Sequence, residues 1–110
     1  MHGGWTDWKP FPDPTKGEFI TAPLGPGCYE LRLKSGRLVL FGCAGHVASR
    51  MTSLHPQGSG TRKNEKKRNF VGEHLSQIEY RTIATESRAA AKEYERRALW
   101  SNRDQYYFRT

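Results

Sequence analysis

The stretch 25–54, GPGCYELRLKSGRLVLFGCAGHVASRMTSL, limits the fold of this chain more than any other part of it. Apolar and other residues alternate over 28–34, a Ser35-Gly36 pair follows, and 38–41 is an apolar run. This pattern predicts two strands joined by a tight two-residue hairpin turn. The segment 42–54 begins with two glycines in four residues and continues with helical spacing of apolar residues. The stretch therefore predicts strand, hairpin, strand, glycine-rich turn and helix.

The two-residue turn also predicts which residues face each other across the hairpin. Tyr29 should lie opposite Gly42, and Cys28 opposite Cys43, where a disulfide is geometrically conceivable. With only two cysteines in the chain, we expect free thiols in a reducing cytoplasm. The residues predicted to face the core from the hairpin and the helix are Tyr29, Leu31, Leu33, Leu38, Leu40, Val47, Met51 and Leu54.

At these residues the chain resembles the GIY-YIG nuclease domain family. Gly27-Cys28-Tyr29 matches the first motif, Leu40-Phe41-Gly42 occupies the second, and Arg50 follows Gly42 at the family's spacing of eight residues. Two positions depart from the pattern. Leu40 stands where the second motif has a tyrosine, and Cys43 stands where the family has a lysine.

The resemblance implies an α/β domain with a small three-stranded antiparallel sheet flanked by helices. The third strand is predicted at 78–84, IEYRTIA, where side chains alternate. Strong helix formers over 85–100 predict a helix that packs through Ala90, Ala91, Tyr94 and Ala98. The predicted organisation is an irregular, Pro- and aromatic-rich N-terminal arm packed on the domain (1–24), the GIY-YIG-like domain (25–100) with a mobile basic loop (55–69), and a C-terminal tail (101–110).

The resemblance also assigns roles to individual residues. Tyr29 would orient or deprotonate the attacking water, unless it is only a core aromatic. Arg50 would stabilise the scissile phosphate, unless it is only a surface charge. His46 or His55 could lie near the site. The catalytic residues implied are Tyr29, Arg50, Glu93, His46 and His55.

A divalent cation, Mg²⁺ or Mn²⁺, is implied by the same resemblance, with its carboxylate on the helix after the third strand. Thr85, Ala89 and Glu93 follow the family's spacing, so Glu93 is the first choice. Glu86 and Glu95 are alternatives. The competing interpretation of Glu93 is a solvated residue paired with Arg96 or Arg97.

The charge of the chain favours an anionic partner. Its formal net charge is +7 and its pI is near 9.7, and nucleic acid is the commonest anionic partner of a small intracellular domain. The resemblance favours DNA as this nucleic acid. Trp5 and Trp8 in the arm either pack on the domain or stack on bases. The expected loop either is simply solvated or contacts phosphate through Arg62, Lys63, Lys66, Lys67 and Arg68.

Three functions remain open from the sequence. The first is a metal-dependent endonuclease acting on DNA, and the second is a nucleic-acid-binding module in which Leu40 marks the loss of catalysis. The third is a protein-interaction domain with incidental charge. The sequence has no apolar run that could span a bilayer and no signal-peptide pattern, so an intracellular, cytoplasmic location is expected. Specificity for a substrate is expected to depend on a partner protein, a homodimer or a DNA structure.

Overall fold

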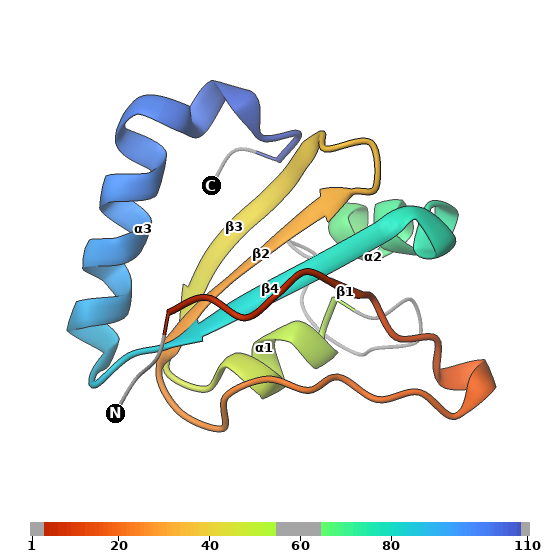
Figure 1. Ribbon diagram of the computed structural model, residues 1–110, viewed down its shortest axis with the longest axis horizontal. Helices are drawn as coiled ribbons and strands as arrows, with labels where there is room; N and C mark the ends of the chain where they lie inside the picture. The colour runs from red at the N-terminus through yellow and green to blue at the C-terminus, as the bar shows by residue number, and fades with distance from the viewer. Residues whose placement is uncertain (1–3, 55–64, 109–110) are drawn as a thin grey trace.

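The computed structural model describes residues 4–54 and 65–108 (Figure 1). It is an α/β fold with a four-stranded antiparallel sheet in the order β1-β4-β2-β3, so β3 forms one edge. None of the helices in the described ranges is long and apolar enough to cross a membrane. The strands and helices are β1 (Lys9–Pro10), β2 (Gly27–Leu33), β3 (Leu38–Ala44), α1 (Val47–Thr52), α2 (Glu65–Glu73), β4 (Ile78–Ala84) and α3 (Arg88–Asn102).

The hairpin β2–β3 has the predicted register only in the part away from its turn. Tyr29 pairs with Gly42 and Leu31 with Leu40, but an irregularity after Leu31 places Arg32 opposite Leu38. The expected two-residue turn is therefore wrong, and the chain turns instead through a longer loop in which Gly36 has a positive φ of 99°. A shift of one residue moves a side chain to the other face of a sheet. Leu38 accordingly packs on the face opposite to the one predicted.

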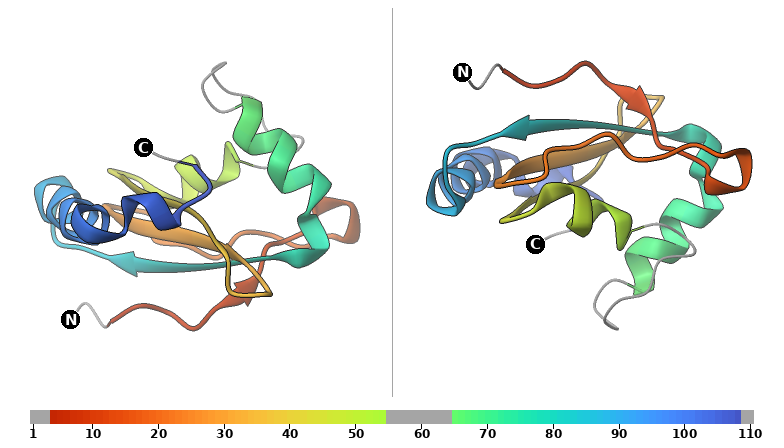
Figure 2. Two further views of the ribbon diagram at one scale, coloured as in Figure 1. Left: turned by 90° about the horizontal axis from the view of Figure 1, so that it is seen from above. Right: turned by 90° about the horizontal axis from the view of Figure 1, so that it is seen from below.

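Two apolar clusters cover the two faces of the sheet. The first contains Tyr29 and Leu40 with residues of α1 and α2, and the second contains Cys28 and Phe41 with residues of α3. The core residues predicted for α1 and the turn after it, which are Val47, Met51 and Leu54, are all buried. Figure 2 shows α1 and α2 on one side of the sheet and the beginning of the arm on the opposite side.

The N-terminal arm adds the fourth strand, which the sequence did not predict. Its short strand β1 pairs with β4, because an extended segment with prolines can still join a sheet at its edge. The Arg81 guanidinium lies 4.6 Å from the ring centre of Trp5 and 4.7 Å from that of Trp8, and Arg32 lies 4.1 Å from Trp8. Arginines of the sheet thus contact both indole rings, which supports packing over base stacking.

Helix α2 corrects the expectation of a mobile loop over 55–69. Residues 65–69 are helical, and 55–64 lie outside the described residues. The helix begins with Glu65, whose negative charge suits a helix N-terminus. Val71 is buried, and Phe70 packs against the same cluster. Burial of this apolar pair stabilises a helix that the charged residues alone would not form.

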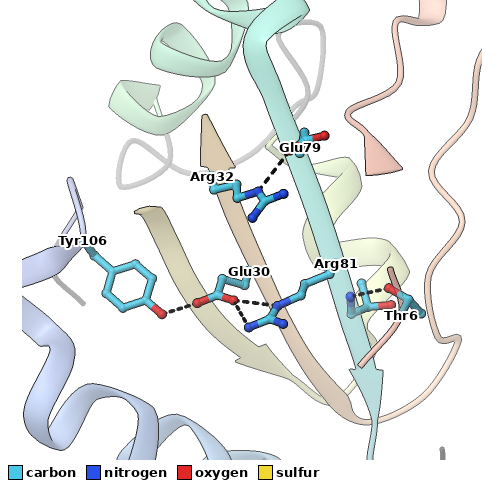
Figure 3. Close-up of polar contacts among 7 residues, drawn as sticks. Thr6, Glu30, Arg32, Glu79, Arg81 and Tyr106 are labelled. Atoms are coloured by element: carbon cyan, nitrogen blue, oxygen red, sulfur yellow. Dashed lines mark hydrogen bonds and ion pairs between the residues drawn. The ribbon is translucent and has the colours of Figure 1, made fainter. Parts of the chain in front are cut away.

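A polar network joins β2, β4 and the C-terminal tail (Figure 3). The buried Glu30 carboxylate accepts a hydrogen bond from Arg81 Nε at 2.7 Å and another from the Tyr106 hydroxyl. The tail continues along β3, where the backbone N–H of Tyr107 donates to Leu38 at 3.1 Å and that of Phe108 to Val39 at 2.9 Å. The network and these two bonds place the tail on the Leu38 end of the β3 edge.

Candidate active site

Tyr29 projects from β2 across the edge strand β3. It lies opposite Gly42, and its side chain is buried. A Cβ atom placed on Gly42 would be 2.4 Å from both Cζ and the hydroxyl oxygen of Tyr29. The tyrosine ring therefore crosses β3 in the space that only a glycine leaves, and this carries its hydroxyl group toward the sheet edge.

Arg50 reaches the same place from α1. Val47 and Met51 fix the helix against the sheet, and His46 caps it by accepting a hydrogen bond at Nδ1 from the Ser49 N–H at 3.1 Å. Arg50 is exposed and close enough to Tyr29 for its charge to lower the pKa of the tyrosine. Burial is the larger effect, and it raises the pKa of Tyr29 to about 12.

Helix α3 brings Glu95 to this group. Ala91 is completely buried, and the Cys28 thiol donates to its carbonyl oxygen at 3.1 Å, so this turn of α3 lies directly against β2. Glu95 follows one turn later on the same face. Its carboxylate raises the pKa of Tyr29 and also that of the Cys43 thiol.

Glu93 lies elsewhere on α3. Its carboxylate accepts hydrogen bonds from Arg96 at 2.5 Å and from Arg97 at 3.3 Å, and the hydrogen bond from Arg96 is the main cause that lowers the pKa of Glu93. These contacts match the solvated alternative for this residue. Glu95, one of the two alternatives, is the glutamate of α3 whose charge acts on Tyr29.

The sequence ranked Glu95 only as an alternative because it placed the buried face of α3 one position away. The observed face runs through Ala91, Ala98 and Leu99, whereas Tyr94 is 45% exposed. The helix also begins later than expected, since Ser87 caps it by accepting from the Ala90 N–H at 3.0 Å. Leu99, the one large apolar side chain in that pattern, was the signal that could have placed Glu95 on the inner face.

Lys67 joins the group from α2. It is half-buried, and its surroundings include Arg50, which lowers its pKa, and Glu95, which raises it. The largest effect is burial, which lowers the pKa of Lys67. An ammonium group is thus present although Cys43 occupies the position where the family has a lysine.

The other predicted residues fall into three groups. His46 serves as the helix cap described above, and Lys66 and Arg68 lie on α2 beside Lys67. His55, Arg62 and Lys63 lie outside the described residues. The structure therefore brings together Tyr29 and Arg50 from the predicted catalytic set, and adds Glu95, Lys67 and Cys43.

The buried groups of β2 predict a loss of stability at high pH. Burial raises the pKa of Cys28 from 9.0 to about 12 and that of Tyr29 from 10.0 to about 12. The folded state holds both protons more tightly than the unfolded chain, so this stabilisation is present at neutral pH and is lost as the pH rises from 9 toward 12. We expect the free energy of unfolding to fall by on the order of 2–4 kcal/mol between pH 8 and pH 11.

Urea unfolding under reducing conditions at several pH values measures this effect. Cys28→Val removes the thiol without emptying its site, and it should flatten the part of the pH dependence that begins near pH 9. A free energy of unfolding that stays constant up to pH 11 in the wild type would show that the two groups titrate normally.

Comparisons with known proteins bear on the fold. No protein-family model and no curated protein matches the sequence. A solved structure is similar, namely the GIY-YIG N-terminal endonuclease domain of UvrC from Thermotoga maritima bound to its catalytic divalent cation, magnesium. The TM-score is 0.54 and the identity 25%, over 80% of this chain and 89% of the other. This chain has a GIY-YIG-like fold. The predicted α/β class is confirmed, and its sheet has one strand more than expected.

The residues of this GIY-YIG-like domain fit a magnesium or manganese ion that has few protein ligands and keeps most of its waters. The described ranges contain no cluster of three or more His, Cys, Asp or Glu residues that could hold a metal. Mg²⁺ keeps several of its waters and is often bound through one or two carboxylates, so Glu95 can serve as its protein ligand. Burial and, after it, the charge of Glu95 raise the pKa of the Cys43 thiol, which disfavours the thiolate that a metal ion would need from this residue.

Proposed function

We propose that this protein is a divalent-metal-dependent endonuclease that hydrolyses phosphodiester bonds in DNA. The observation that carries the proposal is the convergence of Tyr29, Arg50 and Glu95 at the Gly42 end of the β3 edge. A tyrosine, an arginine and a carboxylate supply the groups that hydrolysis of a phosphodiester needs. The net charge of +7 and the magnesium-bound endonuclease of similar fold support the same conclusion.

In this reaction a water oxygen bonds to phosphorus as the bond from phosphorus to the leaving oxygen breaks. The proton that the water loses passes to solvent, and the leaving oxygen takes up a proton in exchange. Arg50 and Lys67 stabilise the negative charge that gathers on the phosphate oxygens. Tyr29 keeps its proton at neutral pH, because its pKa is near 12, and orients the water by hydrogen bonding. That value already includes the lowering by Arg50, so Tyr29 orients the water here and does not act as its base. A divalent cation held by Glu95 would supply Lewis acidity and a bound water of lowered pKa.

Incubation with supercoiled plasmid DNA tests this proposal. Nicked circles should accumulate with Mg²⁺ or Mn²⁺ and not with EDTA, and binding to DNA should weaken as salt is raised, because phosphate contacts release counterions. Retained DNA binding without cleavage under any of these conditions would contradict an endonuclease.

That outcome would favour the second candidate, a nucleic-acid-binding module on the same fold. Leu40 stands where the second motif has a tyrosine, and it is 1% exposed within the first apolar cluster. A leucine there offers no hydrogen bond to water or phosphate. Absence of both cleavage and salt-sensitive DNA binding in the wild type would contradict both candidate functions. The dependence of substrate specificity on a partner protein or a second copy of the chain is a separate prediction, made from the sequence.

Gly42→Ala should impair cleavage without unfolding the domain. The added methyl group would lie 2.4 Å from the Tyr29 hydroxyl oxygen, so the ring must tilt and the hydroxyl must move. A displacement of about 1 Å at a reacting centre costs on the order of 10²-fold in rate. Gly45→Ala is the matched control, because its added Cβ would meet only Arg88 Cδ, at 3.8 Å. Equal nicking rates for the two variants would show that the position of Tyr29 does not matter.

A further inference from the structure

A groove separates α2 from the C-terminal tail. The tail is held on one side by its two backbone hydrogen bonds to β3, and α2 forms the other side. The groove has a volume of about 430 Å³. Its lining residues are Lys66, Asn69, Phe70, Glu73, Tyr107 and Phe108.

Aromatic rings form the floor of this groove. Phe70 stacks on His74 at 4.2 Å between ring centres, and the Tyr107 ring lies 4.6 Å from Phe70 on the tail side. Phe108 packs edge-on against Tyr107 at 4.9 Å. Tyr107 is nevertheless 55% exposed, so more than half of this side chain remains accessible beside a polar and charged rim. An exposed ring held between other rings is suited to stacking on a planar partner.

The groove lies near the proposed active site. Lys66 lines the groove, and the next residue, Lys67, interacts with Arg50 and Glu95. On the tail side, the backbone N–H of Phe108 donates a hydrogen bond to the carbonyl oxygen of Val39. Val39 lies three residues along β3 from Gly42. Three residues of a strand span about 10 Å, so a DNA strand at Tyr29 passes this groove within a few nucleotides of the scissile phosphate.

We infer that the groove binds an unpaired nucleotide of the strand being cut, with its base stacked on Tyr107 and its phosphate contacted by Lys66. This inference rests on the proposed function and narrows its substrate to DNA with a single-stranded segment next to the cut. A base inside a duplex is excluded, because both of its faces are already covered by neighbouring bases. Tyr107 supplies the stacking surface, and Lys66 supplies the charge that a backbone phosphate requires.

The test compares binding of two DNAs in EDTA, where no cleavage occurs. One is a blunt duplex, and the other has the same duplex with a short unpaired extension that carries 2-aminopurine, whose fluorescence falls when it stacks. We expect tighter binding of the extended DNA together with quenching of the fluorophore. Tyr107→Ala should weaken binding of the extended DNA roughly tenfold or more and abolish quenching, whereas Tyr107→Phe should retain both. Lys66→Gln should reduce the salt dependence of binding by about one phosphate contact.

Phe19→Ala is the matched control, since Phe19 is an aromatic residue of the arm that is 85% exposed and does not line the groove. It should change neither affinity nor quenching. Equal binding of the two DNAs by a protein that still cleaves would overturn this inference alone and leave the groove to another occupant, such as a peptide segment of a partner. Absence of any salt-sensitive DNA binding would overturn the proposed function and the inference together.

Discussion

Glu95→Gln is expected to remove metal-dependent cleavage, with a loss in rate of roughly 10³-fold or more. The amide has nearly the same shape as the carboxylate but no negative charge, so its affinity for a divalent cation falls sharply. The position of the helix should be unchanged, because Ala91 and its contact with Cys28 fix this part of α3. The rate of plasmid nicking at several Mg²⁺ concentrations measures the effect.

Glu93→Gln is the matched control for this prediction. The same change is made two residues away on the same helix, at a carboxylate that bonds to Arg96 and Arg97 on the surface. Exposed ion pairs contribute little to stability, so this variant should fold normally and cleave at a rate close to that of the wild type. The reverse result, with Glu93→Gln inactive and Glu95→Gln active, would restore the assignment made from the sequence alone.

Arg50→Ala is expected to lower the cleavage rate by roughly 10²- to 10³-fold. The substitution removes the guanidinium that stabilises charge on the phosphate. It should also raise the pKa of Tyr29 further, because Arg50 is the neighbour that lowers it. Arg50→Lys keeps the positive charge. It should therefore restore part of the cleavage rate and return the pKa of Tyr29 most of the way to its wild-type value. Nicking rates and titration of the Tyr29 ring by NMR measure these two effects separately.

Arg37→Ala is the control for lost positive charge, since Arg37 is an exposed residue of the hairpin loop. A similar loss of cleavage in Arg37→Ala and Arg50→Ala would mean that Arg50 acts only through net charge. A pKa of Tyr29 that does not change in Arg50→Ala would place the guanidinium away from the hydroxyl.

The part of the site that could be predicted from the sequence is the part made by local structure. Tyr29 lies opposite Gly42 because the hairpin pairs residues that are close in the chain. Arg50 lies near them because a short helix with buried Val47 and Met51 follows the second strand. The α/β class follows from the same patterns, since alternating strands and an amphipathic helix allow few arrangements.

The sequence did not rank Glu95 first among the candidate carboxylates, and it did not place Lys67 beside Tyr29. Helix α3 is rich in alanine, and Leu99 is the one large apolar side chain that marks its buried side. Contact between Cys28 and Ala91, which are 63 residues apart, sets the rotation that brings Glu95 inward. Burial of Phe70 and Val71 likewise makes a helix of residues that appear as a charged loop, and this places Lys67 at the site.

The sequence by itself determined the hairpin, the helix after it, and the pairing of a tyrosine with a glycine beside an arginine. Only the tertiary structure decided which glutamate faces that pair, that Lys67 joins it, and that the tail and α2 form a groove next to it. The physical reason is the range of the interactions. Backbone pairing and helical periodicity act between near neighbours in the chain, whereas the rotation of a helix and the position of a tail depend on burial against residues far away in sequence.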